Sequence, residues 1–218
     1  MQAPKSGVIT SDDGVSRCWW CVGDPLYESY HDNEWGRPVA DDTRLFEKLS
    51  LEGFQSGLSW ITILRKRENF RRAFKTFDIP SVARFNNRSV ERLMLDAGIV
   101  RNRAKIEATI NNAKRCLSLI EEYGSLTAYA WSFEPDEHPR SWTANWAALV
   151  NMGPSPEATA MSKDLKKRGW AFVGPTTVYS FMEAMGMVND HMNKCDIGAQ
   201  VEAERTRFRR PQSRGADR

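Results

Sequence analysis

Cysteine and histidine residues in two distant parts of the chain have the types and spacing of metal ligands. Near the C-terminus, NDHMNKC places His191 and Cys195 four residues apart, so one helical turn would bring both side chains to a common point. Near the N-terminus, Cys18, Cys21 and His31 offer further donors. Zinc takes four ligands in a tetrahedron, so either Cys18 with Cys21 or Cys18 with His31 would complete a site with the C-terminal pair. Spacing alone favours the Cys-x-x-Cys pair, and the alternative is a chain that binds no metal.

Glu52 is a second residue with a chemical role to explain. It follows Leu45 by seven residues and Leu49 by three, so a helix would place it on the apolar face of this segment. Burying an unpaired carboxylate costs on the order of several kcal/mol. Either Glu52 pairs with a nearby arginine or lies past the end of the helix at Gly53, or it lies at the wall of a pocket. In a pocket it can accept hydrogen bonds from a ligand or stabilise developing positive charge.

Aromatic residues are concentrated close to these positions, in YESYHDNEWG and its surroundings. Tyr and Trp carry polar groups that a core must satisfy, so such a group can also line a pocket that stacks a flat ligand. A flat ligand held between aromatic rings and recognised by a carboxylate suggests a nucleobase. The alternative is an ordinary aromatic core. The residues concerned are Trp20, Tyr27, Tyr30, Trp35 and Trp60.

The elements that must position these residues are predicted to be helices almost throughout. The apolar residues repeat with the helical period and form no alternating strand pattern, so the fold is expected to be mainly α. We expect one helical domain over residues 17–199, with two lobes possible, between a disordered N-terminus (1–16) and a basic disordered tail (200–218). Residues 134–160 are expected to be a long connection. The predicted helices lie in 41–58, after caps at Ser59 and Ser89, in 103–123 before Gly124, and from Pro175 to Gly186.

Composition limits the class of protein. The chain has 218 residues, of which 41% are hydrophobic and 27% charged, a globular profile. No apolar run reaches membrane-spanning length, and the N-terminus lacks the apolar core of a signal peptide, so a cytoplasmic protein is expected. Neither G-x-S-x-G nor a phosphate-binding G-x-x-x-x-G-K-[ST] loop occurs, which disfavours serine-triad and phosphate-loop enzymes.

The segment LMLDAGIVRNRAKI joins two predicted helices through a short turn at Gly98 and Ile99. It resembles the helix-hairpin-helix element of DNA repair proteins, in which turn amides and the following helix N-terminus hold a phosphate. Arg101, Arg103 and Lys105 suit this role because they add positive charge. The alternative is an ordinary turn between two helices.

Several of these strings together resemble one family, the bacterial 3-methyladenine DNA glycosylase I (Tag) family. The resemblance extends from about residue 17 to 195 and is carried by RCWWCVGDPLYESYHDNEWG, LFEKLSLEGFQSGLSWITILRKRENFR, DAGIVRNRAKI and LKKRGWAFVGPTTVYSFMEAMGMVNDH. It implies a helical glycosylase of the helix-hairpin-helix superfamily whose structural zinc joins the N- and C-terminal segments. It also implies a monofunctional hydrolase, acting as a monomer on double-stranded DNA with alkylated bases. Such an enzyme flips out and excises 3-methyladenine, releasing the free base and leaving an abasic site.

The resemblance also assigns roles to individual residues. The zinc ligands fall on Cys18, His31, His191 and Cys195, which displaces Cys21 from the set that spacing favours. The remaining assignments fall into two groups. Base binding falls on Tyr30, Trp60 and Glu52, with Glu52 also catalytic and with Tyr27, Trp20 and Trp35 lining the pocket; DNA contact falls on Gly57 and Leu58, near the gap left by the extruded nucleotide.

Two other classes of protein are consistent with parts of the sequence. One is a zinc-stabilised DNA-binding module without catalysis, which would keep the hairpin and the basic clusters. The other is an enzyme acting on sugars, in which Glu34 and Glu52 would form an acid pair. The hairpin and the basic clusters argue against the second.

Overall fold

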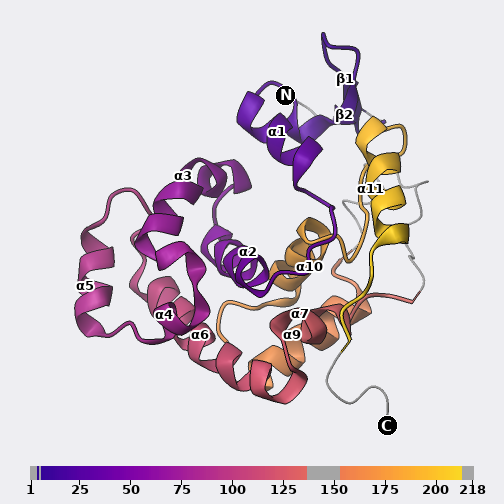
Figure 1. Cartoon of the computed structure of the whole chain (residues 1–218). Coiled ribbons are helices and arrows are strands. Elements are labelled where there is room, and N and C mark those ends of the chain that lie inside the picture. The colour runs from indigo at the N-terminus through magenta and orange to yellow at the C-terminus, as the bar shows by residue number, and fades with distance from the viewer. Residues whose placement is uncertain (1–3, 5, 137–152, 213–218) are drawn as a thin grey trace. The chain divides into compact units, whose positions relative to one another are not determined.

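The computed structural model describes residue 4 and residues 6–136 and 153–212 of the chain. The chain divides into two compact units. One unit contains residues 1–39, 134–155 and 182–209, and the other contains residues 40–133, 156–181 and 210–218. Most described residues are helical, which confirms the mainly α fold (Figure 1).

The unit that begins at residue 40 is built from helices alone among its described residues. Helix α2 lies against α3, α6 and α7, and α6 also packs on α4 and α5 (Figure 1). Phenylalanine rings pack against one another in the core next to α2 and α3. They are those of Phe54, Phe70, Phe74 and Phe77. The elements of this unit are α2 (Asp42–Gln55), α3 (Trp60–Ala73), η2 (Lys75–Phe77), α4 (Ile79–Ala83), α5 (Asn87–Leu95), α6 (Arg103–Tyr123), α7 (Leu126–Trp131), α9 (Pro156–Lys167) and the greater part of α10 (Pro175–Ala184).

Local capping explains where these helices begin and end. The side chain of Asn102 accepts a hydrogen bond from the Lys105 amide at the start of α6, and Gly124 ends it in the left-handed conformation, at φ 89°. The predicted cap at Ser89 is wrong by one turn. Asn86 caps α5 instead, and Ser89 completes a capping box from inside the helix. Ser59 occupies the predicted N-cap position of α3, but its hydroxyl pairs with that of Thr62 rather than with a backbone amide.

The other unit contains the two strands of the described chain, β1 (Val8–Thr10) and β2 (Ser16–Cys18), followed by η1 (Trp19–Cys21) and α1 (Pro25–Asn33). The strands pair antiparallel, with Val8 opposite Cys18. Helix α11 (Asp196–Arg207) packs against β2 (Figure 1). The β-hairpin is held by the hydrogen bonds between β1 and β2 and by a hydrogen bond from the Ser16 amide to Asp196. Neither contact produces a long periodic pattern in the sequence.

Three boundaries therefore differ from the sequence-based expectation. The N-terminal segment 1–16 is ordered into a strand from Val8, and the expected tail from residue 200 is helical as far as Arg207. In the expected connection 134–160, residues 137–152 lie outside the described chain, and helix α9 begins at Pro156. The physical reason is the same at both ends, since burial of Cys18 and Val201 in one cluster orders segments whose composition is polar.

No helix among the described residues is long and apolar enough to cross a membrane.

Candidate functional site

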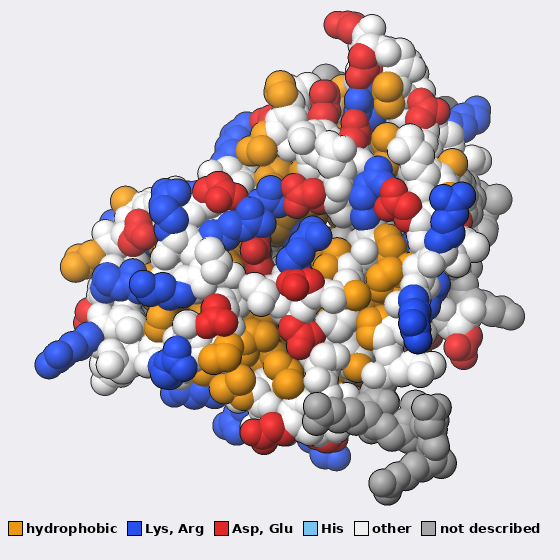
Figure 2. Space-filling model, viewed as in Figure 1, with side chains coloured by type: hydrophobic (Ala, Val, Ile, Leu, Met, Phe, Trp, Pro, Cys, Tyr) orange, Lys and Arg blue, Asp and Glu red, His pale blue; other side chains and the backbone are white. Residues whose placement is uncertain are grey.

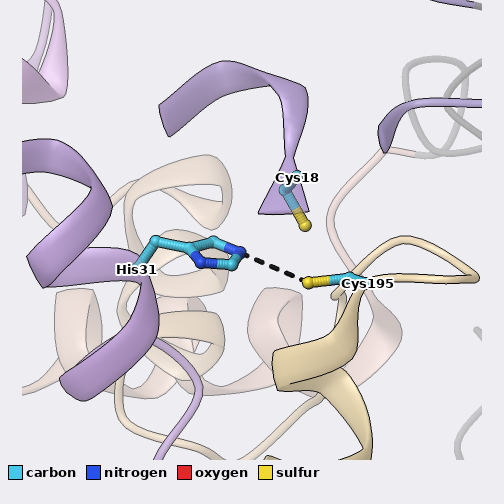
Figure 3. A group of neighbouring side chains, drawn as sticks. All are labelled: Cys18, His31 and Cys195. Atoms are coloured by element: carbon cyan, nitrogen blue, oxygen red, sulfur yellow. Dashed lines mark hydrogen bonds between the residues drawn. The ribbon is translucent and has the colours of Figure 1, made fainter. Parts of the chain in front are cut away.

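The first candidate site is a buried group of two cysteines and a histidine. Cys18 ends β2, His31 lies on α1, and Cys195 precedes α11 (Figure 3). One ligand atom from each of the three residues lies within 4.8 Å of the others. The three side chains point toward a common centre, with His31 Nε2 3.6 Å from Cys195 Sγ. Segments separated by more than a hundred residues in the sequence thus supply the ligands of one potential metal site.

Electrostatics at this group favour a thiolate on Cys195. The hydrogen bonds from Cys18 and from His31 lower the pKa of the Cys195 thiol to about 5, against the effect of burial. Burial raises the pKa of the Cys18 thiol. Because metals bind the deprotonated thiolate, a metal ion could readily displace the proton that Cys18 and Cys195 share.

His191 lies next to this group, although it is not one of the three clustered ligands. Its ring centre is 5.0 Å from that of His31, and its Nδ1 lies 2.9 Å from Asn189 Oδ1. Its Nε2 is buried and has no hydrogen-bond partner among the described residues. Burial holds the pKa of His191 well below its ordinary value, so the ring is neutral. A neutral imidazole oriented through Nδ1 with Nε2 unsatisfied has the properties of a metal ligand.

Cys21 does not belong to the group. Its thiol donates a hydrogen bond to the Cys18 carbonyl at 3.1 Å, because the 3-10 helix η1 turns it back onto its own backbone. Burial raises its pKa to about 12. The preference that spacing gave to the Cys-x-x-Cys pair is therefore wrong in this structure, and His31 occupies the corresponding position in the group.

Sequence reasoning missed the residues that orient His31. Asp32 Oδ1 lies 2.8 Å from His31 Nδ1, and the same carboxylate accepts a hydrogen bond from Arg17 Nε at 2.9 Å. Arg17 also pairs with Asp13. The hydrogen bonds from Arg17 and His31 lower the pKa of Asp32 against the effect of burial. The only signal in the sequence was the adjacency of an aspartate to a candidate ligand histidine.

The N-terminal aromatic residues surround the histidines. Trp20 packs edge-on against Trp35, with ring centres 5.0 Å apart, and its ring is tilted against that of Tyr27, with centres 4.9 Å apart. Trp35 in turn contacts His191 at 4.5 Å. Tyr30 is 5% exposed, on the same helix as His31. Within this unit, aromatic residues therefore pack together beside His31 and His191.

Glu52 and Trp60 belong to the other unit. Glu52 lies on α2, its side chain is 5% exposed, and its Oε1 is 2.7 Å from Lys48 Nζ. Pairing with a nearby arginine was one of the alternatives that the sequence left open, and the partner is instead a lysine one turn earlier on the same helix. Lys48 Nζ lies 3.2 Å from the centre of the Trp60 ring, a cation–π contact.

Glu52 also lines a pocket of about 340 Å³. Both the end of α2 and the start of α10 contribute to its walls. Among its lining residues, Glu52 is the only ionisable one. Burial raises the pKa of Glu52, and Lys48 opposes this effect. The lining consists of Glu52, Gln55, Ser56, Gly57, Leu58, Thr176, Thr177 and Ser180.

The predicted hairpin is a turn between α5 and α6. Ile99 is buried, and the carbonyl of Gly98 accepts hydrogen bonds from Lys66 and Asn69 on α3, which anchor the turn. Arg101 and Arg103 are exposed, and Arg103 also pairs with Glu91. Lys and Arg side chains gather on the surface over α3 and α5 (Figure 2).

Lys105 differs from its predicted role. Its ammonium is buried and donates hydrogen bonds to the carbonyls of Phe54 and Ser56, at 2.8 and 2.6 Å. These carbonyls end α2, where positive charge is stabilising. Because it is the third residue of a helix whose exposed face begins with Arg103, Lys105 turns inward, away from the surface on which it was expected to contact phosphate.

A family model for methyladenine glycosylase matches residues 20–198. The chain belongs to this family. The methyladenine glycosylase of Escherichia coli (strain K12), DNA-3-methyladenine glycosylase 1, is 48% identical over 181 residues, which cover 83% of this chain and 96% of that protein.

Solved structures of methyladenine glycosylases have the same fold. A crystal structure of 3-methyladenine DNA glycosylase I is 46% identical, with a TM-score of 0.77, and the match covers 83% of this chain and 98% of the other. A second, of a tyrosine-to-phenylalanine variant in complex with 3-methyladenine, is 34% identical, with a TM-score of 0.77, over 91% of this chain and 99% of the other. The family resemblance inferred from sequence motifs is confirmed.

In this methyladenine glycosylase, the residues predicted to do chemistry fall into one set in each unit. The unit with the two strands holds the group of Cys18, His31 and Cys195 and the aromatic residues around it, and the all-helical unit holds Glu52, Trp60 and the hairpin. Lys48 and Asp32 are the functional candidates that the sequence did not reveal.

Proposed function

We propose that this chain is a DNA glycosylase that flips 3-methyladenine out of alkylated duplex DNA and hydrolyses its N-glycosidic bond, leaving an abasic site. The identity with the E. coli enzyme over nearly the whole length of that protein carries the proposal. Extrusion is less costly for a base whose pairing is weakened by methylation, which supplies a first level of selection.

Hydrolysis of this bond requires little protonation of the departing base by the protein. A 3-methylated adenine nucleoside carries positive charge, so its glycosidic bond is weak and the base departs neutral. Glu52 contributes by accepting hydrogen bonds from the edge of the base and by stabilising its positive charge. The support is its position in the wall of a pocket, where it is the one ionisable residue among the described lining residues.

Aromatic side chains supply the second part of recognition. Trp60 stacks on the face of the cationic base, as its ring already does with an ammonium group. The family resemblance also assigns base binding to Tyr30 and the lining of a base pocket to Tyr27, Trp20 and Trp35. These assignments are supported by the packing of the four side chains into one group. Trp20, Tyr27 and Trp35 are partly exposed, and Tyr30 is buried.

The loop after α2 approaches the DNA. Gly57 adopts a left-handed conformation, with φ at 80°, and Leu58 is 42% exposed, unusual for a leucine. We assign Leu58 to the gap left by the extruded nucleotide. Gly98, Ile99, Arg101 and Arg103 hold a backbone phosphate at the hairpin, and Lys105 holds the loop rather than the phosphate.

A zinc ion is proposed for the group of Cys18, His31, His191 and Cys195. In a tetrahedral zinc site the ligand atoms are roughly 3.3–3.8 Å apart, and His31 Nε2 and Cys195 Sγ are 3.6 Å apart in a group whose three ligand atoms lie within 4.8 Å of one another. The buried Nε2 of His191, which has no hydrogen-bond partner among the described residues, supports His191 as the fourth ligand. Bound there, zinc would be structural, because it would join the N-terminal hairpin and α1 to the start of α11.

A base-release assay tests the proposed function. The purified protein is incubated with duplex DNA treated with a methylating agent, and the released bases are separated and identified by mass spectrometry. We expect free 3-methyladenine. Binding to DNA without release of any base would replace the proposal with the alternative, a zinc-stabilised DNA-binding module.

A further inference from the structure

The Lys48 ammonium lies between the two groups that are proposed to recognise the base. Its Nζ is 2.7 Å from Glu52 Oε1 and 3.2 Å from the centre of the Trp60 ring. The side chains of Lys48 and Glu52 are only 7% and 5% exposed. A cation is therefore already held against an aromatic face and a carboxylate inside the protein.

The two contacts of Lys48 are the two that a cationic base needs. A flat cation stacks on a tryptophan face within about 6 Å of its centre, and a buried carboxylate requires a positive partner. The ammonium and a base stacked on the same face of Trp60 cannot occupy the same space. Binding of the base to both groups thus requires that the ammonium leave.

We propose that in the free protein Lys48 fills the cation site formed by Glu52 and Trp60, and that a cationic methylated base takes its place when it enters. This inference rests on the proposed function, since the exchange has meaning only if the ligand is a cationic base bound by these two residues.

An exchange of cations would make the site selective for charge. A cationic base would replace the ammonium as the positive counter-charge of Glu52, whereas a neutral base would leave the buried carboxylate without one. The same exchange would assist release of the product. Once the glycosidic bond breaks, the base is neutral, and the return of Lys48 to Glu52 favours its departure.

Among the described groups around Glu52, Lys48 is the one that supplies its counter-charge. Burial and Lys48 are the influences that set the pKa of Glu52, with burial raising it and Lys48 lowering it. In the part of the chain that the structure describes, the pocket residues that face Glu52 from α10 and from the loop after α2 are uncharged. Loss of the ammonium would therefore leave the carboxylate of Glu52 to take up a proton.

The test compares the wild type with Lys48→Met, which keeps the length of the side chain and removes the charge. Two quantities are measured from mildly acidic to mildly alkaline pH: kcat/KM for methylated duplex DNA, and inhibition by free 3-methyladenine. We expect about tenfold stronger product inhibition of the variant at neutral pH, because no tethered ammonium competes for the site. We also expect kcat/KM of the variant to rise with pH where the wild type is flat, since Glu52 must lose its proton before it can bind a cation.

The matched control is Glu47→Gln, one residue before Lys48. It breaks the ion pair of Glu47 with Arg71 on α3 and should leave both the inhibition and the pH profile as in the wild type. Lys48→Gln serves as a second uncharged variant.

Each result decides the matter. Inhibition and pH dependence equal to those of the wild type, or weaker inhibition, would overturn the exchange and make Lys48 a structural partner of Glu52. Failure of both uncharged variants to fold would also count against it, because a pair whose loss unfolds the protein is not one that a ligand can replace. If the wild type itself releases no 3-methyladenine, the proposed function fails, which is a separate outcome.

Discussion

The Lys105 ammonium donates a hydrogen bond to the Ser56 carbonyl at 2.6 Å, which joins the first turn of α6 to the end of α2. The residue thus connects the hairpin proposed to hold a phosphate with the loop of Gly57 and Leu58. A basic residue that the sequence suggested for phosphate contact instead fixes the loop that we propose to approach the DNA.

Replacing Lys105 with methionine should therefore destabilise the protein and slow base release. The carbonyls of Phe54 and Ser56 would lose a charged donor, and hydrogen bonds to charged groups contribute about 1.5–3 kcal/mol each, so a loss of roughly 3–6 kcal/mol in unfolding free energy is expected. Urea denaturation measures it. Lys114→Met, at an exposed position on the same helix, should leave the midpoint unchanged, and equal effects of the two variants would contradict the assignment.

Glu52→Gln should lower the rate of 3-methyladenine release by about 100-fold, the effect expected when one pre-organised charge is removed from an active site. Single-turnover release from methylated DNA measures it. Because the substitution leaves Lys48 buried without its partner, the double variant Lys48→Met/Glu52→Gln provides the matched fold control. A near wild-type rate in either correctly folded variant would show that Glu52 has no part in catalysis.

Metal content distinguishes the two ligand sets. The purified wild type should contain about one zinc per chain, and His31→Ala should lose most of it, because a structural site needs all four ligands. Cys21→Ala should keep its zinc, since the Cys21 thiol is turned toward the Cys18 carbonyl. Elemental analysis after gel filtration gives the answer, and the reverse pattern would restore the Cys-x-x-Cys site.

Asp32→Asn should weaken zinc binding by about 10–100-fold without removing a ligand, because the carboxylate fixes the ring of His31. Competition with a chromophoric chelator measures the affinity. Asp13→Asn is the control: Asp13 contacts Arg17 on the side exposed to solvent and touches no ligand, so its loss should change the affinity little. Equal affinities of Asp32→Asn and the wild type would remove Asp32 from the site.

Much of the helical architecture was predictable because its signals are local. Asn102 and Gly124 bound α6 through contacts within a few residues, and Pro175 begins α10 where its fixed φ suits a first turn. The family, too, could be identified from short strings of residues. Polar composition predicted disorder at both ends of the chain, but burial of Cys18 and Val201 in one cluster orders the adjoining segments.

Other features were decided by tertiary structure alone. Cys21 and His31 are both plausible ligands by spacing, and the turn of η1 and the orientation of α1 choose between them. Likewise, the sequence does not show that Lys48 and Lys105 are buried, yet one pairs with a buried carboxylate and the other with the carbonyls at the end of a helix. Periodicity tells which residues share a face of a helix. What that face meets depends on how helices distant in sequence pack, and only the folded chain determines this.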